Sequence, residues 1–397
     1  MKYAIILPDG AADEPLASLG DQTVLEAART PNMDAVVEQG RIGTVRTVPD
    51  GFAPGSDVAT MSLFGYDPRA HYSGRAPIEA VARGISTTAD DVVFRCNLVH
   101  IDNGVMTDFT AGHIRTQESE SILRDLNAAF AGEPLRFHAG VSYRNLLVIS
   151  DPEAIDVACM PPHDIPGERV EEYQPKGKAG RRIREIMERA RPIVTGHDVN
   201  QVRMDLGELP ATDIWLWGQG VVPILKRFKQ RFGVRGAVIA AVDLIRGLGK
   251  LIGWTQIEVP GATGYLDTDY AGKGRAAVEA LDDFDLVAVH IEATDEAGHQ
   301  GDARAKIDAL EKIDSLIVEP ILERLQAFDE WRILIAPDHP TPVSQKTHTA
   351  DPPPFCMAGT NVPRGPSGQN RFCERVARGG GLHIDAGYEL MEYFLRR

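Results

Sequence analysis

Short runs of consecutive apolar residues, each ending in a turn or an acidic residue, constrain the fold of this chain most. Such runs lack the alternation of a half-exposed strand and fit strands that are buried on both faces of a sheet. The runs are YAIILPDG (3–10), RFHAGVSYRNLLVIS (136–150), DIWLWGQG (213–220), GAVIAAVD (236–243), DLVAVHIEATD (285–295) and WRILIAPDH (331–339). Helical patterns lie between them, at 23–39, 118–131, 180–190, 272–281 and 302–327. Strands that alternate with helices predict an α/β fold with a mostly parallel sheet and flanking helices.

The chain has 397 residues, which is enough for two domains. The region from about 150 to 212 is richer in proline, charge and turn residues than its flanks. We therefore expect a smaller α/β domain inserted into the main one. The predicted parts are 1–115 for the first piece of the main domain, 116–212 for the insert and 213–397 for the second piece. Each boundary of the insert is placed to within about fifteen residues, because no glycine-serine linker marks it.

Charge and cysteine usage narrow the class of protein. The formal net charge of −15 repels nucleic acid, so we expect no nucleic-acid partner. The first apolar run, MKYAIILPDG, is too short for a signal peptide, and no stretch approaches the roughly 18–20 apolar residues of a membrane helix. A cytoplasmic location without a membrane partner is expected, and an oligomer is compatible with this composition. Scattered cysteines without a C-x-x-C pair argue against disulfides and thiolate zinc sites; they are Cys96, Cys159, Cys356 and Cys373.

Metal-type ligands follow three of the predicted buried strands. Asp9 ends the first run, Asp295 and His299 follow DLVAVHIEA, and Asp338 and His339 end the last run. Ligands of open α/β sheets bind beyond the carboxyl ends of the strands, so we expect these side chains to share one edge. Each alone is weak: an aspartate after a strand is usually a turn or cap residue, and the Asp295–His299 spacing also fits an exposed ion pair. The set is more specific than its members.

Two further residues extend this set. His348 lies in the polar, proline-bounded loop SQKTHTADPPPF, and Ser56 lies in FAPGSDVATMSLFGYDP (52–68), where a Pro-Gly turn precedes an expected helix. A serine at the start of a helix is ordinarily an N-cap. It is also where a nucleophile would benefit from the helix N-terminus, which favours an anionic group. On this stretch alone the N-cap is the more ordinary interpretation of Ser56, and both interpretations are open at this point.

The ligand types indicate the chemistry. Oxygen and imidazole ligands without thiolates suit manganese, magnesium or zinc. Three aspartates, three histidines and one serine are enough for two ions, and two ions about 3.5–4 Å apart suit phosphoryl or sulfuryl transfer. One ion would activate the hydroxyl of Ser56 as a nucleophile.

The motifs PDG, PGSDVATMSLFGYDP, YSGRAPIEA, DEAGH, PDH and THTADPPPF, with VPGATGYLDTDYAGKG and GYELMEYFL, resemble one known family. It is that of the archaeal-type cofactor-independent phosphoglycerate mutases, in the alkaline phosphatase superfamily. The resemblance spans almost the whole chain. It implies an alkaline-phosphatase-like domain interrupted by a smaller substrate-orienting domain. It also implies two divalent ions, manganese first and magnesium, zinc or cobalt as alternatives, with no bisphosphoglycerate and no nucleotide.

Carried over residue by residue, the resemblance implies one metal held by Asp295, His299 and His348. It implies a second held by Asp9, Ser56, Asp338 and His339, with Ser56 transiently phosphorylated. The residue after the Asp-His pair departs from the family, because Pro340 stands where a small residue is expected. Proline lacks a backbone donor, which puts the shape of this loop in doubt.

Three residues are candidates for handling the substrate. His113 in DFTAGHI resembles the family's histidine beside the phosphoserine and could shuttle a proton. Arg144 in GVSYRN and Arg75 in SGRAP could clamp a carboxylate or phosphate, although both could equally be surface or hinge residues.

The leading hypothesis is interconversion of 3-phosphoglycerate and 2-phosphoglycerate, a glycolytic step, on a small anionic phosphorylated substrate. The rival keeps the metal site and changes the substrate, as in a proposed homoserine kinase or a phosphatase, because fold and metals do not choose the acceptor. A non-enzymatic metal-binding or scaffold protein is the third alternative. A structural metal site, however, would not need a serine at the start of a helix.

Overall fold

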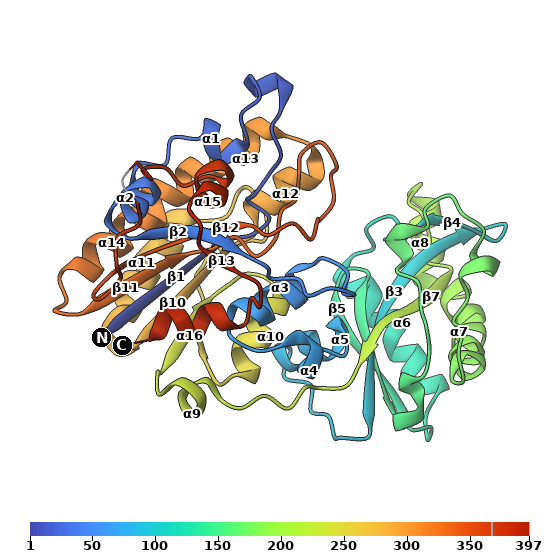
Figure 1. Cartoon of the computed structure of the whole chain (residues 1–397). Helices are drawn as coiled ribbons and strands as arrows, with labels where there is room; N and C mark the ends of the chain where they lie inside the picture. The colour runs from blue at the N-terminus through green and yellow to red at the C-terminus, as the bar shows by residue number, and fades with distance from the viewer. Residues whose placement is uncertain (367, 397) are drawn as a thin grey trace. The chain divides into compact units, whose positions relative to one another are not determined.

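The computed structural model describes residues 1–366 and 368–396, and the chain divides into two compact units. Unit 1 comprises Met1–Tyr72 and Ile224–Arg397, and unit 2 comprises Ser73–Pro223 (Figure 1). Across the described part of the chain, none of the helices combines the length and apolar character needed to cross a membrane. Unit 2 thus lies, in sequence, between the two pieces of unit 1.

Unit 1 is built on an eight-stranded sheet in the order β13-β2-β12-β11-β1-β10-β8-β9. The strands are β1 (Lys2–Pro8), β2 (Arg41–Val45), β8 (Gly236–Ile239), β9 (Thr255–Gln256), β10 (Leu286–Ile291), β11 (Trp331–Ile335), β12 (Pro354–Gly359) and β13 (His383–Ile384). β1 lies between β10 and β11 and is parallel to both, and only β12 runs antiparallel to its neighbours among the described strands of this sheet. This confirms the predicted mostly parallel sheet.

Helices cover both faces of this sheet. The helices of unit 1 are α1 (Val24–Ala27), α2 (Pro31–Gln39), α3 (Ser56–Leu63), α4 (Pro68–His71), α9 (Phe228–Phe232), α10 (Asp243–Leu251), α11 (Tyr270–Asp283), α12 (Ala293–Gln300), α13 (Ala303–Ile313), α14 (Glu319–Gln326), α15 (Glu374–Gly379) and α16 (Glu389–Leu395). On one face, alternate residues of β1, β10 and β11 pack with α2, α11, α13 and α14 in the main hydrophobic core. On the other face, the Tyr3 ring of β1 packs edge-on against Phe394 of α16.

Two predicted helices are interrupted. The pattern at 23–39 forms α1 and α2, because Pro31 begins a new helix at its first position. The pattern at 302–327 forms α13 and α14, joined without a break by one π-helical stretch at Asp314–Val318. The apolar pattern predicted both regions correctly but could not locate the interruptions.

Unit 2 has its own five-stranded sheet, in which every pairing of the described strands is antiparallel. Its strands are β3 (Asp91–Asp102), β4 (Val105–Asp108), β5 (Leu135–Val141), β6 (Arg144–Ser150) and β7 (Asp213–Gly220), and its helices are α5 (Arg75–Ala82), α6 (Thr116–Ala129), α7 (Gly180–Thr195) and α8 (Asp198–Asp205). Short 3-10 turns complete it, at Pro152–Ile155, Pro162–Asp164 and Val170–Tyr173. The run at 136–150 is thus a hairpin of two strands.

The predicted start of the insert, at residue 116, is wrong. The long strand β3 pairs with β4, β6 and β7, so the chain from Ser73 onwards belongs to the sheet of unit 2. Because β7 pairs with β3, it also belongs to the sheet of unit 2, whose last residue, Pro223, lies within the fifteen residues allowed for the predicted boundary at 212.

Candidate functional site

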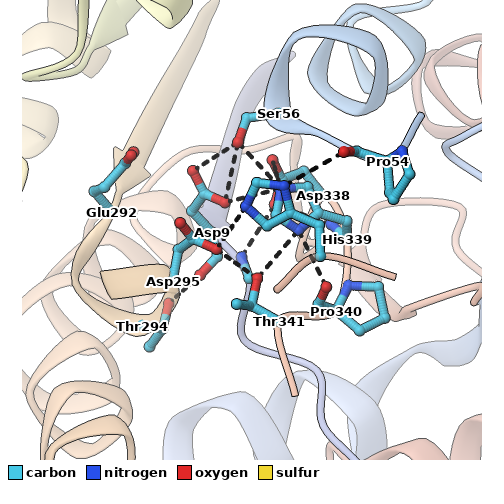
Figure 2. Close-up of polar contacts among 12 residues, drawn as sticks. Asp9, Pro54, Ser56, Glu292, Thr294, Asp295, Asp338, His339, Pro340 and Thr341 are labelled. Atoms are coloured by element: carbon cyan, nitrogen blue, oxygen red, sulfur yellow. Dashed lines mark hydrogen bonds and ion pairs between the residues drawn. The ribbon is translucent and has the colours of Figure 1, made fainter. Parts of the chain in front are cut away.

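The carboxyl ends of three adjacent strands in unit 1 deliver the predicted ligands to one place. Asp9 directly follows β1, and Asp338 and His339 lie in the loop after β11. Asp295 lies in the first turn of α12, which follows β10. Because β10, β1 and β11 are parallel neighbours, these residues meet at a single edge (Figure 2).

Asp295, His299 and His348 form the first group. His299 Nε2 lies 3.2 Å from Asp295 Oδ2, and His348 Nε2 lies 3.4 Å from Asp295 Oδ1. The Nε2 atoms of the two histidines are 2.9 Å apart. The four-residue spacing of Asp295 and His299 places both on one face of α12, as the sequence predicted.

The other ring nitrogen of each histidine is held by the backbone. His299 Nδ1 is 3.0 Å from the carbonyl oxygen of Lys346, and His348 Nδ1 is 3.4 Å from that of Pro54. A carbonyl acceptor fixes the proton on Nδ1 and leaves Nε2 free to accept a metal, which is the usual arrangement of metal-binding histidines.

Asp9, Asp338 and His339 form the second group, and each is fully buried. His339 Nε2 lies 3.5 Å from Asp9 Oδ1 and 3.5 Å from Asp338 Oδ2. The rings of His339 and His348 are 4.2 Å apart between centroids, so the two groups adjoin.

Ser56 completes the second group. Its Oγ lies 3.3 and 3.4 Å from the two carboxylate oxygens of Asp9 and 3.1 Å from His339 Nε2 (Figure 2). The N-cap of α3 is Gly55, which has no side chain to cap the helix, and Asp57 Oδ1 accepts from the Val58 backbone N–H of the first turn at 2.9 Å. The interpretation of Ser56 as an N-cap is therefore wrong: the serine is the first helical residue, and its hydroxyl points to the acidic group.

Buried carboxylates crowd the second group, and this arrangement favours a cation there. Burial, together with the nearby carboxylates of Asp338, Glu292 and Asp295, raises the pKa of Asp9 well above its usual range. Burial lowers the pKa of His339, so the imidazole is neutral and brings no positive charge. Asp338 Oδ2 is buried and has no hydrogen-bond partner among the described residues. A divalent ion would supply both the missing charge and the missing partner, so the residues fit a metal here.

The first group is electrostatically different. Although burial opposes it, hydrogen bonds from His299 and His348 hold the pKa of Asp295 well below its usual range. The hydrogen bond to Asp295 raises the pKa of His299 to about 9, against the effect of burial. Without a metal, a proton on His299 therefore compensates the Asp295 carboxylate, and a bound ion would take the place of that proton.

Sequence reasoning missed His290, which lies within β10 and is almost fully buried. Its Nε2 is 2.9 Å from Asp9 Oδ2, and burial lowers its pKa to about 4, so its imidazole is neutral. With Glu292 and Asp9 it forms a third cluster of metal-type residues. The buried Lys273 donates to the His290 carbonyl at 3.1 Å, which places a cation of the protein itself beside this corner. The sequence did carry a signal for this residue, because His290 stands in the middle of an otherwise apolar strand.

Pro340 fits its loop without distortion of His339. Its carbonyl oxygen accepts from the Thr349 backbone at 3.0 Å and lies 3.3 Å from His339 Nδ1. The loop is thus held through the Pro340 carbonyl, which needs no backbone donor.

The three predicted substrate-handling residues all lie in unit 2. His113, in the loop after β4, and Arg144, the first residue of β6, both contact Tyr143: the His113 ring centroid is 6.3 Å from the Tyr143 ring, and Arg144 Nε donates to the Tyr143 hydroxyl at 3.1 Å. Arg75 begins α5 and donates to Glu79 at 2.8 Å. The structure thus brings His113 and Arg144 together around one aromatic ring, whereas their roles stay predictions.

Two further residues of unit 2 were missed. Arg95 of β3 is buried, lies 3.2 Å from Glu79 and stacks over the Trp217 ring at 4.3 Å. The His163 ring packs against the same Trp217, and burial, with a contribution from nearby arginines, lowers its pKa. The position of Arg95 within an apolar strand was the signal in the sequence, because a buried arginine requires a partner for its charge.

Comparison with known proteins agrees with this geometry. Residues 38–200 match the family model described as 2,3-bisphosphoglycerate-independent phosphoglycerate mutase. A protein of that name from Methanosarcina acetivorans is 48% identical over 392 residues, which cover 98% of each chain. A relative from Geobacter sulfurreducens, named a probable enzyme of this kind, is 44% identical over 401 residues and the full length of both chains.

Solved structures give the same result for the fold. A Pyrococcus horikoshii protein superposes with a TM-score of 0.84 and 29% identity, over 99% of this chain and 96% of that one. The cofactor-independent phosphoglycerate mutase from Thermoplasma acidophilum superposes with a TM-score of 0.68 and 26% identity, over 100% of this chain and 99% of that one. By its similarity to full-length relatives, the chain belongs to the 2,3-bisphosphoglycerate-independent phosphoglycerate mutase family.

Proposed function

We propose that this chain interconverts 3-phosphoglycerate and 2-phosphoglycerate through a phosphoserine intermediate on Ser56, in the cytoplasm. The observation that carries the proposal is the position of Ser56, at the start of α3 with its hydroxyl beside Asp9 and His339. The identity to relatives named as this enzyme supports the substrate.

Two divalent ions would supply positive charge that activates the serine and neutralises the phosphoryl oxygens. We expect manganese first, with magnesium, zinc or cobalt as alternatives. Asp295, His299 and His348 would hold one ion. The second would be held by Asp9, Ser56, Asp338 and His339.

The residues of the chain would act as follows. Ser56 would release its hydroxyl proton to solvent when the ion binds, and its Oγ would then attack the phosphorus, forming an O–P bond while the bond between phosphorus and the C3 oxygen breaks. The same Oγ would leave again as the anion when the C2 oxygen attacks the phosphoserine. His113 donates a proton to the C3 oxygen and later accepts one from the C2 hydroxyl when it attacks the phosphoserine. The backbone N–H groups at the start of α3 would favour the anionic phosphoryl group on Ser56, although the Val58 N–H already donates to Asp57 Oδ1.

This mechanism predicts turnover without a second phosphate donor. Protein loaded with manganese should convert 3-phosphoglycerate to 2-phosphoglycerate in the absence of nucleotide and of bisphosphoglycerate, because the phosphoryl group stays on the enzyme between the two half-reactions. Phosphorus NMR of the reaction mixture measures both isomers and free phosphate. Parallel reactions contain homoserine with a phosphate donor. Turnover of homoserine alone would contradict the mutase, and free phosphate as the main product would indicate a phosphatase.

Arg144 is proposed to bind the carboxylate of the glycerate. Replacement by alanine should lower kcat/KM about 10- to 100-fold, since a hydrogen bond to a charged group contributes about 1.5–3 kcal/mol. Steady-state kinetics with 3-phosphoglycerate measure the loss, and the yield of free phosphate should rise as glycerate escapes. Arg136→Ala is the matched control, because Arg136 is an exposed arginine of the same hairpin. Equal kinetics in the two variants would exclude Arg144 from binding.

A further inference from the structure

A buried lysine contacts two of the loops that carry the metal-type ligands. Lys306 of α13 has no solvent-exposed side-chain surface. Its Nζ lies 2.8 Å from Asp13 Oδ2, 2.8 Å from the Thr341 carbonyl oxygen and 3.3 Å from the Ala12 carbonyl oxygen. Three acceptors match the three donors of an ammonium group. Lysine side chains are almost never fully buried unless an opposite charge compensates them. Here the carboxylate of Asp13 compensates the charge of Lys306.

The acceptors of Lys306 come from two separate loops. Ala12 and Asp13 belong to the loop after β1 that begins with Asp9, and Thr341 belongs to the loop after β11 that contains Asp338 and His339. The loops are also joined directly: Gly10 N donates to Asp338 Oδ1 at 3.1 Å, and Thr341 N donates to the Gly10 carbonyl at 3.2 Å. Lys306 therefore ties together the backbones that position the second group.

Thr341 connects this junction to the first group. Its hydroxyl donates to Asp295 Oδ1 (Figure 2). The backbone approaches Thr341 closely at two glycines. A Cβ on Gly10 would lie 2.6 Å from Thr341 Oγ1, and one on Gly298 of α12 would lie 2.4 Å from the Thr341 carbonyl oxygen. Thr341 therefore contacts both sides: its carbonyl accepts from Lys306, and its hydroxyl donates to Asp295.

We propose that Lys306 is a positioning residue for the metal site: by holding the Thr341 carbonyl, it keeps the Thr341 hydroxyl directed at Asp295. This rests on the two-metal part of the proposed function and is independent of which phosphate ester is the substrate. The competing explanation is that the Lys306–Asp13 pair only stabilises the fold.

Calorimetric titration of Mn²⁺ into metal-free full-length protein tests the proposal without any substrate. Lys306→Met removes the three donors in a side chain of similar length, and it should weaken manganese binding about 10- to 100-fold, as loss of a residue that orients a metal ligand typically does. Lys312→Met is the matched control, because Lys312 is exposed on the same helix, and it should bind like the wild type. Wild-type affinity of the Lys306→Met protein would overturn the proposal.

A double-mutant cycle with Thr341→Val distinguishes positioning from general stabilisation. Valine keeps the shape of threonine and removes the hydroxyl that donates to Asp295. If Lys306 acts through Thr341, the double variant should bind manganese about as weakly as the weaker single variant. Losses that multiply, or wild-type affinity of Thr341→Val itself, would overturn the proposal.

Removal of a single partner from a buried ion pair is strongly destabilising, so Lys306→Met/Asp13→Asn provides a neutral background for the same titration. Asparagine retains an oxygen to accept from Val343 N, which lies 3.2 Å from Asp13 Oδ1. We expect the double replacement to recover thermal stability while manganese binding stays weak. Joint recovery of stability and affinity would show that the pair is structural only. Failure of wild-type protein to turn over 3-phosphoglycerate would instead contradict the proposed substrate and leave this result standing.

Discussion

Replacement of Ser56 by alanine should abolish phosphoryl transfer and leave the fold intact. The hydroxyl caps no helix and lies beside Asp9 and His339, so its loss removes the nucleophile and little else. Loss of a nucleophile typically lowers kcat by roughly 10⁴- to 10⁶-fold. Rapid quenching with labelled 3-phosphoglycerate should trap phosphate on wild-type Ser56 and none on the variant. Thermal unfolding should be nearly unchanged, whereas loss of a cap would cost about 1 kcal/mol.

Ser62→Ala is the matched control for this experiment. Ser62 lies in the same helix, is buried, and donates to the Thr47 carbonyl at 2.6 Å. Its removal should cost about 1–3 kcal/mol of stability by leaving that carbonyl without its partner, while activity persists. If Ser56→Ala kept a tenth of the wild-type rate, Ser56 would not be the nucleophile.

The strand order explains why much of this site could be predicted from sequence. Asp9 and Asp338 are far apart along the chain, but each follows an apolar run. Parallel strands place their carboxyl ends at one edge of a sheet, whatever the length of chain between them. Identifying the strands therefore placed Asp9, Asp295 and Asp338 at one edge, and the adjacency of β10, β1 and β11 in the sheet brings them together. The N-cap interpretation of Ser56 failed because the local pattern of a cap and of an N-terminal nucleophile is the same.

The first boundary of the insert could not be predicted, because the sequence of β3 is not a continuous apolar run. Arg95 and Asn97 interrupt it, and both are buried. Arg95 is accommodated by Glu79 and Trp217, and Asn97 Oδ1 accepts from Trp217 Nε1 at 3.1 Å. These partners lie far away in the sequence. Lys306 was missed for the same reason: a lysine in a helical pattern reads as exposed until its three acceptors are known.

Removal of divalent metal should abolish activity reversibly. Chelation followed by gel filtration should lower the rate at least about a thousandfold, more than loss of one oxyanion-hole donor usually costs. Manganese, magnesium, zinc or cobalt should restore part of it, measured as conversion of 3-phosphoglycerate. The physical reason is the uncompensated charge of the second group, where burial and three nearby carboxylates raise the pKa of Asp9. Full activity in a rigorously metal-free preparation would exclude the two-metal mechanism.

The same experiment has a pH dependence with a definite sign. In metal-free protein the Asp295 hydrogen bond raises the pKa of His299 to about 9, above the value of about 6.5 expected in the unfolded chain. This ion pair therefore stabilises the metal-free fold fully below about pH 6.5, and the stabilisation is lost as the pH rises through about 9. A histidine that binds metal must be neutral, so the loaded protein lacks this dependence. The rise in Tm on adding manganese should consequently grow from pH 6.5 to 9. A constant rise would show that His299 gives up no proton to the metal, which would remove His299 from the ligand set.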